Sequence, residues 1–361
     1  MPTLPLKPGD TIGVMGGGQL GRMLAMAAAR LGLKTVVLDP DRGGPAAQVA
    51  DRQIAAAYDD AQGLEALAQA ADVVTFEFEN VPAASVQRLI DLGCEVAPGA
   101  RALAVAQDRF EEKSFLNQVG APTVRFLGAT TAEEASRAAE SLGAPCLMKI
   151  RREGYDGKGQ AWIEHASEAG EAFHRLGDRP VILEAAADFT RELSVIAARS
   201  RAGEIAAFPM GENHHEGGIL RRTLAPAEVS EAAREHADQF AARILGALDY
   251  VGVIGIELFE LKDGRLLVNE IAPRVHNSGH WTLDGCEVDQ FEQHVRAVAG
   301  WPLGPVHALG RTEMTNLIGA DADAWQDLLA DPTARLWLYG KDEARPGRKM
   351  GHVNRLWPSE G

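Results

Sequence analysis

The sequence predicts that the chain begins with a doubly wound α/β domain. Near the N-terminus, short apolar strands alternate with a helix and a glycine-rich turn, as in an open parallel sheet. Later in the chain, neighbouring apolar strands are joined by short turns, which predicts hairpins. With 361 residues and 46% apolar content, the chain is too long for one compact domain, so roughly two or three domains are expected.

The composition excludes several classes of function. A net charge of −15 argues against a nucleic-acid surface, although local basic clusters can still bind a small anion. Cys94, Cys146 and Cys286 are widely spaced, which indicates neither a disulfide framework nor a thiolate metal site. The N-terminus lacks a signal-peptide pattern, and no stretch has the roughly 18 apolar residues of a membrane span. We therefore expect a soluble, cytoplasmic protein with no nucleic-acid or membrane partner.

The first strand-to-helix turn carries a glycine pattern. A strand over Thr11–Met15 runs into G-x-G-x-x-G at Gly16–Gly21, a helix follows, and a second strand, Thr35–Leu38, ends at Asp39. This order is typical of dinucleotide binding, so a nicotinamide oxidoreductase is one hypothesis. No second cofactor motif follows, and any open α/β sheet can use glycines here. The pattern therefore supports the fold and an anion-binding helix N-terminus more than it supports a cofactor.

The first domain continues with a second strand-and-acid pattern. We expect a helix near Leu64–Ala70, a strand over Val73–Phe76 and a short strand at Cys94–Pro98, closing the domain near residue 106. Glu77 and Glu79 follow the strand Val73–Phe76 directly. Acids at the carboxyl end of such a strand lie where ligands bind, although an ordinary polar strand exit is an equal alternative.

The central stretch combines a lysine strand with a glycine-rich hairpin. Its predicted elements are helices over Arg101–Val119 and 130–142 and strands at Cys146–Ile150 and Ala161–Ile163. Between the two strands, residues 151–160 hold several glycines and cations, with Lys149 near the base. The P-loop spacing is absent, and a flexible surface hairpin is the alternative. The cations around the glycines favour phosphate binding through backbone N–H groups.

The remaining chain alternates strands with one long helix. We expect strands at Val181–Glu184, Arg191–Ile196 and Glu313–Ile318, an irregular segment over Gly211–Leu220, and a helix over Ser230–Leu245. The chain ends in a basic segment, Lys341–Lys349. That segment is either a solvated terminal hairpin or a site for a substrate phosphate, and we favour the phosphate.

A second hairpin, within Val253–His280, places two acids opposite each other. Asp263-Gly264 suits a two-residue turn. Counting outward from it pairs Lys262 with Arg265, Leu261 with Leu266, and Glu257 with Glu270. Like charges about 5 Å apart destabilise a sheet unless a cation lies between them. Because their neighbours are mostly apolar, we favour a Mg²⁺ site over an exposed sheet face with two solvated glutamates.

These features resemble the ATP-grasp superfamily. The chain has, in order, an α/β unit, a lysine strand with a glycine hairpin, a strand exit followed by a Glu, and a carboxylate hairpin ending in Asn269-Glu270. Within the superfamily, the chain is similar to the 5-(carboxyamino)imidazole ribonucleotide synthases. The matching motifs are Gly18–Leu24, Phe76–Pro82, Gly154–Gln160, Asn269–Trp281 and Arg345–Lys349.

The resemblance implies a fold and a reaction. The fold would be α/β and α+β: an N-terminal domain over residues 1–106, a small central lobe over 107–186 and a larger C-terminal lobe over 187–361, with a basic subdomain from about residue 300. ATP would phosphorylate bicarbonate to carboxyphosphate, which carboxylates aminoimidazole ribonucleotide with Mg²⁺ as cofactor. Members of this family are commonly homodimers.

The resemblance also assigns residues to the ATP site. Arg109 and Lys149 would contact the phosphates, the ribose would bind Glu192, and the nucleotide site would be completed by His215, which we favour over its neighbour His214. The full set is Arg109, Lys149, Gly154, Tyr155, Asp156, Gly157, Lys158, Gly159, Gln160, Glu184, Ala185, Ala186, Ala187, Glu192, His215, Asn269 and Glu270. Glu184 to Ala187 would line the adenine pocket through backbone groups.

The remaining assignments concern the metal, the ribonucleotide and the chemistry. Glu257 and Glu270 would hold Mg²⁺, and Arg274 would hold bicarbonate or carboxyphosphate because its planar fork binds such anions bidentately. The residues that would carry the chemistry are Arg274, Lys149, Tyr155 and Asp156. The ribonucleotide would contact Gly18, Gln19, Leu20, Glu77, His276, Asn277, Ser278, Lys341 and Arg348, of which Lys341 and Arg348 would bind its 5′-phosphate.

Three alternatives remain open at this point. A ribonucleotide transformylase or a biotin carboxylase shares the lysine, the glycine hairpin and the metal carboxylates but not the Arg274–His280 motif. A nicotinamide oxidoreductase depends only on Gly16–Gly21 and Asp39. A catalytically inactive ATP-grasp scaffold is disfavoured because the lysine, both glutamates and Arg274 are all present.

Overall fold

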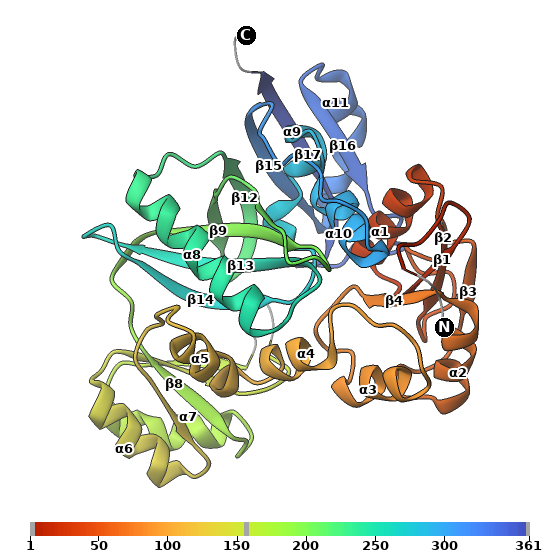
Figure 1. The fold of residues 1–361 in the computed structure, drawn as a ribbon. Coiled ribbons are helices and arrows are strands. Elements are labelled where there is room, and N and C mark those ends of the chain that lie inside the picture. Colours follow the sequence, from red (N-terminus) through yellow and green to blue (C-terminus); the bar gives the residue numbers. More distant parts are fainter. Residues whose placement is uncertain (1–3, 155–158, 359–361) are drawn as a thin grey trace.

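The computed structural model describes residues 4–154 and 159–358, which form three β-sheets with helices packed against them (Figure 1). Tyr155, Asp156, Gly157 and Lys158, which the resemblance places in the nucleotide site, lie outside the described residues. Within the described part of the chain, every helix is too short or too polar to cross a bilayer.

The N-terminal sheet is parallel, with the strand order β3-β2-β1-β4. Its elements are β1 (Thr11–Met15), α1 (Gln19–Arg30), β2 (Lys34–Leu38), β3 (Arg52–Ile54), α2 (Ala61–Ala70), β4 (Val73–Phe76) and α3 (Ala83–Asp91). β1, β2 and β4 are mostly buried, because helices cover a parallel sheet on both faces, whereas the edge strand β3 is partly exposed. The predicted strand at Cys94–Pro98 is wrong, since only Val96 bridges to Val74 there.

The segment after this sheet is two helices rather than the single helix predicted over Arg101–Val119. α4 (Ala100–Ala106) ends at Gln107, and α5 (Arg109–Gln118) begins after Asp108. The Asp108 carboxylate accepts hydrogen bonds from the N–H groups of Phe110 and Glu111, which makes it the N-cap of a new helix. Continuous apolar spacing concealed this break.

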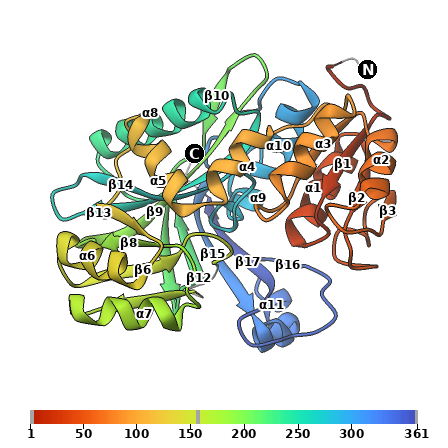
Figure 2. The ribbon, with the colours of Figure 1, turned by 90° about the horizontal axis from the view of Figure 1, so that it is seen from below.

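The central sheet has the order β5-β8-β6-β7 and is antiparallel. Its elements are β5 (Phe126–Ala129), α6 (Ala132–Leu142), β6 (Cys146–Ile150), β7 (Gln160–Ile163), η1 (Ala166–Glu168), α7 (Ala169–Arg175) and β8 (Val181–Ala185). α6 and α7 lie side by side along it (Figure 2), and their alanines form a small separate core with the sheet. This unit is the smaller lobe.

The third sheet has nine strands in the order β14-β13-β9-β11-β12-β15-β17-β16, with β10 paired to β9. The strands are β9 (Phe189–Arg199), β10 (Ile205–Ala207), β11 (Gly211–Glu216), β12 (Ile219–Ala225), β13 (Gly252–Leu261), β14 (Leu266–Ala272), β15 (Gly310–Ile318), β16 (Ala334–Leu338) and β17 (Lys349–Pro358). The helices are α8 (Glu231–Ala247), η2 (Asn277–Gly279), α9 (Thr282–Gly285), α10 (Gln290–Ala299), η3 (Gly319–Ala324) and α11 (Trp325–Ala330). The segment 211–220, expected to be irregular, is instead the β11–β12 hairpin.

The carboxylate hairpin differs from its ideal form in two compensating ways. Leu261 N donates to Arg265 O and Gly264 N donates to Leu261 O, so the loop is Lys262–Gly264 and the predicted pairs Lys262–Arg265 and Leu261–Leu266 are wrong. Gly264 takes the left-handed conformation that such a loop requires. A bulge at Asn269 then shifts the register back, and Glu257 pairs with Glu270 as predicted.

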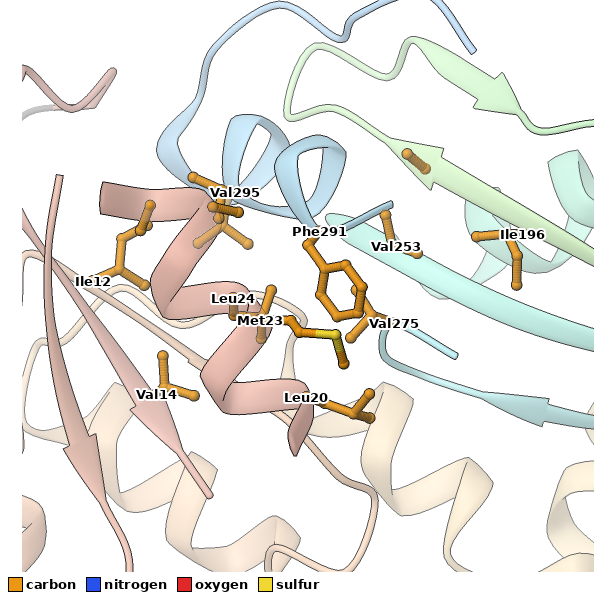
Figure 3. Close-up of a cluster of buried hydrophobic side chains, with 14 of the residues drawn as sticks. Ile12, Val14, Leu20, Met23, Leu24, Ile196, Val253, Val275, Phe291 and Val295 are labelled. Carbon is orange, nitrogen blue, oxygen red and sulfur yellow. The ribbon is translucent and has the colours of Figure 1, made fainter. Parts of the chain in front are cut away.

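A shared apolar core joins the N-terminal unit to the large sheet (Figure 3). Met23 and Leu24 of α1 face Phe291 and Val295 of α10, and β13 contributes Val253 to the same cluster. Phe291 is fully buried, and truncating such a ring costs about 3–5 kcal/mol. This core holds the carboxyl end of β4 beside the large sheet, where the candidate site lies.

Candidate functional site

A cleft of about 630 Å³ lies where the three sheets meet, and it collects most of the predicted site residues. The carboxyl ends of the parallel strands place side chains on one wall of the cleft, and the hairpins of the other two sheets form the opposite walls. The predicted residues that line it are Gly18, Gln19, Leu20, Glu77, Arg109, Lys149, Gly154, Gln160, Glu192, His215, Glu257, Asn269, Glu270, Arg274, His276 and Asn277.

Other predicted residues lie elsewhere. Ala185, Ala186 and Ala187 line a second cavity of about 490 Å³ at the junction between the central and large sheets. Five further predicted residues are not among the described residues that line the main cleft. They are Gly159, Glu184, Ser278, Lys341 and Arg348. Lys341 Nζ donates to Lys349 O at 2.6 Å, and Lys349 itself lines the cleft.

A buried ionic cluster lies at the base of the central lobe. Lys149 Nζ is 2.8 Å from a Glu184 carboxylate oxygen, and Lys113 Nζ is 3.4 Å from the other oxygen. Glu184 and Lys113 are almost fully buried. Burial alone would raise the pKa of Glu184, but the two ammonium groups lower it, so the carboxylate stays ionised. Lys149 is thereby held at the cleft wall.

Arg109, the first residue of α5, connects the glycine hairpin to the carboxylate hairpin. Its guanidinium lies 2.8 Å from Glu270 Oε2 and donates to Gly154 O at 3.1 Å. Its backbone N–H donates to Arg151 O at 3.0 Å. One helix N-terminus therefore anchors two segments that the sequence predicts to act together.

The two glutamates of the carboxylate hairpin differ in charge state. Burial, together with the charge of Glu270, raises the pKa of Glu257 to about 7. Burial alone would also raise the pKa of Glu270, but Arg109 and Lys149 lower it to about 2.

These residues fit a magnesium ion. The Asn269 bulge turns its amide toward the same cleft, with Nδ2 3.5 Å from Glu257 Oε2. No group of three or more His, Cys, Asp or Glu side chains suited to a metal occurs within residues 4–154 and 159–358. Two carboxylates suit Mg²⁺, which takes its remaining ligands from water and phosphate oxygens.

Arg274 is fixed from the N-terminal unit. Its Nε donates to a carboxylate oxygen of Glu79, and its Nη1 donates to Val275 O at 3.1 Å. The guanidinium is largely buried and lines the cleft. Because these contacts orient the planar fork, its other N–H groups are preorganised to bind a small planar anion.

His276 lies beside the carboxylates as a neutral imidazole. Burial and the nearby Arg274 charge lower its pKa to about 3. Its Nδ1 is 2.8 Å from Ser278 Oγ, and its Nε2 is 3.5 Å from Glu257 Oε1. Ser278 therefore orients the ring from behind. His215, rather than His214, reaches the cleft from β11, with its Nδ1 2.7 Å from Glu192.

The glycine turn of the N-terminal sheet is already capped by protein carboxylates. Glu77 accepts hydrogen bonds from Gly18 N and Gly21 N at 2.5 Å each, and Asp39 accepts one from Gly17 N at 2.6 Å. A dinucleotide pyrophosphate needs these same N–H groups. The nicotinamide hypothesis is therefore disfavoured by the very turn on which it rested.

Several residues at the site were not assigned from the sequence, and four of them hold or border the predicted residues. They are Glu79, which holds Arg274; Glu112 and Lys113, which contact β14; and Lys349, which lines the cleft beside His276. Glu79 and Lys349 stand in the acidic strand exit and the basic C-terminal segment, so their positions were flagged. Glu112 and Lys113 lie on an ordinary charged helix and gave no such signal.

Comparison with known proteins agrees with this geometry. The ribonucleotide synthetase preATP-grasp domain family matches residues 10–107, the ATP-grasp domain family matches residues 114–291, and the phosphoribosylaminoimidazole carboxylase C-terminal domain family matches residues 312–360. N5-carboxyaminoimidazole ribonucleotide synthase of Brucella melitensis is 52% identical over 355 residues, which cover 98% of each chain.

Solved structures show the same fold. The Staphylococcus aureus N5-carboxyaminoimidazole synthetase complexed with ADP matches with a TM-score of 0.93 and 37% identity, covering 98% of this chain and 94% of that chain. The Aspergillus clavatus enzyme, in complex with ADP and 5-aminoimidazole ribonucleotide, matches with a TM-score of 0.91 and 33% identity, over 98% and 95%. The predicted ATP-grasp fold is thus confirmed, and the chain belongs to the N5-carboxyaminoimidazole ribonucleotide synthase family.

Proposed function

We propose that this protein carboxylates 5-aminoimidazole ribonucleotide with bicarbonate at the expense of ATP, giving N5-carboxyaminoimidazole ribonucleotide, ADP and phosphate in purine biosynthesis. Family membership supports the reaction. The observation that carries it is that one cleft joins phosphate-binding cations to Arg274 and His276, the two sides that a carboxyphosphate route needs. The alternatives among other ATP-grasp enzymes lack the Arg274–His280 motif.

Lys149 and Arg109 would bind the ATP phosphates. Phosphoryl transfer depends mainly on positioning and on neutralising charge, and both cations are already oriented by carboxylates. Gly154 to Gln160, including Tyr155 and Asp156, would close over the phosphates. Glu192 would take the ribose hydroxyls, His215 would complete the nucleotide site, and backbone groups of residues 184–187 would border the adenine.

Glu257 and Glu270 would hold Mg²⁺, with Asn269 beside them. When bound, the ion neutralises the phosphate charge that builds up during transfer. Its binding would also offset the charge of Glu270, which together with burial raises the pKa of Glu257. The described side chains supply few ligands, which leaves room for water and phosphate oxygens.

Arg274 would hold bicarbonate against the γ-phosphate. A bicarbonate oxygen attacks the γ-phosphorus, ADP leaves, and carboxyphosphate forms. The exocyclic amine of the ribonucleotide then attacks the carboxyl carbon, phosphate leaves, and the amine loses a proton. The oriented fork of Arg274 is suited to the planar bicarbonate, and the Glu79 contact fixes it before substrate arrives.

The ribonucleotide would occupy the side of the cleft next to the N-terminal sheet. Its base would lie against His276, Asn277 and Ser278, its 5′-phosphate would face the basic segment, and Glu77 and Gly18–Leu20 would also face this substrate. Asn277 is held by reciprocal side-chain hydrogen bonds with Asn316, at 3.0 and 2.8 Å. Lys341 and Arg348 would bind the 5′-phosphate, with Lys349 nearer the reacting groups.

A steady-state assay tests the proposal directly. ATP hydrolysis by the purified protein should require Mg²⁺ and rise sharply only when aminoimidazole ribonucleotide and bicarbonate are both present. If the ribonucleotide has no effect, the substrate assignment fails while the nucleotide site stands. We also expect a cytoplasmic homodimer with domain boundaries near residues 106 and 186, which sedimentation and limited proteolysis can check.

A further inference from the structure

One face of α5 covers the edge of the large sheet. β14 is the outermost strand on its side, so half of its backbone groups have no neighbouring strand. Arg109, Glu112 and Lys113 are spaced i, i+3 and i+4, which places all three on one helix face toward β14.

This face contacts three consecutive residues of β14. Arg109 forms an ion pair with the Glu270 side chain at 2.8 Å. Lys113 Nζ donates to Asn269 O at 2.9 Å, and Ile271 N donates to Glu112 Oε1 at 2.7 Å. The bulge and both residues after it are therefore held from one side by α5.

The bulge gives these contacts their importance. In a regular strand, Asn269 and Glu270 would point to opposite faces, and a slip of one residue would exchange their positions. The extra residue lets both side chains reach the cleft, and Asn269 itself pairs with no residue of β13. Lys113 donates to the Asn269 carbonyl, and Glu112 accepts from the strand just beyond it.

Both contacts are made by buried ionisable groups. Lys113 is 1% exposed and Glu112 is 3% exposed, and burying such groups is costly unless they are well paired. Lys113 also lies 3.4 Å from Glu184, which in turn binds Lys149. The same helix face thus connects the bulge to Lys149, which lines the cleft.

We propose that Glu112 and Lys113 are positioning residues, which hold the β14 bulge so that Asn269 and Glu270 face the Mg²⁺–nucleotide site together. The inference rests on the proposed function for the identity of the ligand. The role of these two side chains follows from their hydrogen bonds to the backbone of residues 269 and 271.

The test compares matched substitutions on two faces of α5. Glu112→Leu removes the acceptor for Ile271 N, whereas Glu112→Gln keeps an amide oxygen that can accept it. Glu111→Leu makes the same change one residue away, on the exposed face. Lys113→Met removes the second contact and keeps the proposal testable if Glu112→Leu does not fold. The measurements are ADP affinity with and without Mg²⁺, by calorimetry, and hydrogen exchange over residues 266–272.

Glu112→Leu and Lys113→Met should weaken Mg²⁺-dependent ADP binding by about tenfold or more and speed exchange in β14. Their Mg²⁺-free ADP affinity should change much less. Glu112→Gln and Glu111→Leu should stay close to the unmodified protein. The proposal is overturned if Glu112→Leu and Lys113→Met bind Mg²⁺·ADP normally, or if Glu111→Leu weakens it equally. An unmodified protein that binds Mg²⁺·ADP but shows no ribonucleotide-stimulated turnover would refute the carboxylation instead.

Discussion

Glu257 and Glu270 face each other across the β13–β14 ladder, yet the pKa of one carboxyl is raised to about 7 and that of the other is lowered to about 2. Both carboxyls are partly exposed, and desolvation raises the pKa of each, so the difference comes from their partners. Arg109 and Lys149 stabilise the charge on Glu270. The negative charge of Glu270 in turn raises the pKa of Glu257. The pair is therefore polarised, with its negative charge held mainly on Glu270.

Glu270→Gln should nearly abolish turnover while leaving the fold intact. The substitution keeps the size of the side chain but removes the charge that Mg²⁺ and Arg109 need, and the loss should reach about 100-fold. Steady-state turnover and circular dichroism check this expectation. Glu171→Gln, on an exposed face of α7, is the matched control. Near-normal activity of Glu270→Gln would refute the paired-carboxylate site.

Glu79→Gln should slow carboxylation without weakening ATP binding. The Glu79 carboxylate orients Arg274 through Nε, and a neutral amide would leave the guanidinium less firmly placed. A displacement of about 1 Å at such a group can cost about 100-fold in rate. Arg274→Lys should lose as much, because an ammonium group lacks the bidentate fork. Equal losses in ATP affinity would show that these residues act on the nucleotide instead.

Lys341 should make ribonucleotide binding sensitive to alkaline pH. Burial and the neighbouring Arg348 charge lower its pKa to about 8, against the opposing effect of Glu77, with Lys349 also nearby. The ammonium form, which a phosphate requires, is present below pH 8 and is lost above it. The KM for the ribonucleotide should therefore rise as the pH increases through about 8, while the KM for ATP stays constant.

Lys341→Arg separates this effect from other alkaline transitions, because a guanidinium stays charged throughout the range. The rise in the KM for the ribonucleotide near pH 8 should disappear in this variant. Lys341→Ala should raise that KM at neutral pH, since a phosphate contact remote from the reacting amine binds ground and transition states alike. A change in the KM for ATP would mean that the basic segment has been misassigned.

The sequence predicted local chemistry better than it predicted backbone geometry. Strand periodicity and Asp263-Gly264 led correctly to the Glu257–Glu270 pair, but only because a longer loop and the Asn269 bulge offset each other. Neither feature leaves a periodic signal in the sequence. The same limit explains the helix break at Asp108, which an N-cap interaction decides.

Long-range pairing was the other limit. The glycine turn, read alone, suits a dinucleotide, and only the fold brings Glu77 onto its N–H groups from 56 residues away along the chain. The basic segment predicted a cluster of cations near the cleft. Which member lines it depends on strand alternation in β17, which begins at Lys349. The charge pattern was enough to predict that the segment Lys341–Lys349 lies near the cleft. That Lys349 is the residue that lines it depends on tertiary packing.

Stability should fall on mild acidification because of histidines buried in neutral form. His352 of β17 is fully buried, its Nδ1 lies 2.8 Å from Tyr339 Oη, and its ring is 4.9 Å from that of His280. Burial lowers the pKa of His352 to about 3, below the ordinary value of 6.5. In the unfolded chain His352 is therefore protonated below about pH 6.5, whereas in the folded chain it stays neutral until the pH falls to about 3.

The stabilisation from His352 is complete above pH 6.5 and decreases as the pH falls toward 3. At pH 5 the loss is roughly 2 kcal/mol, which should appear as a fall of about 2–3 °C in Tm between pH 7.5 and pH 5. His352→Gln cannot be protonated, so its Tm should depend less steeply on pH. His307→Gln, at an exposed position, should keep the slope of the unmodified protein. If His352→Gln retains the full slope, the acid sensitivity arises from other groups.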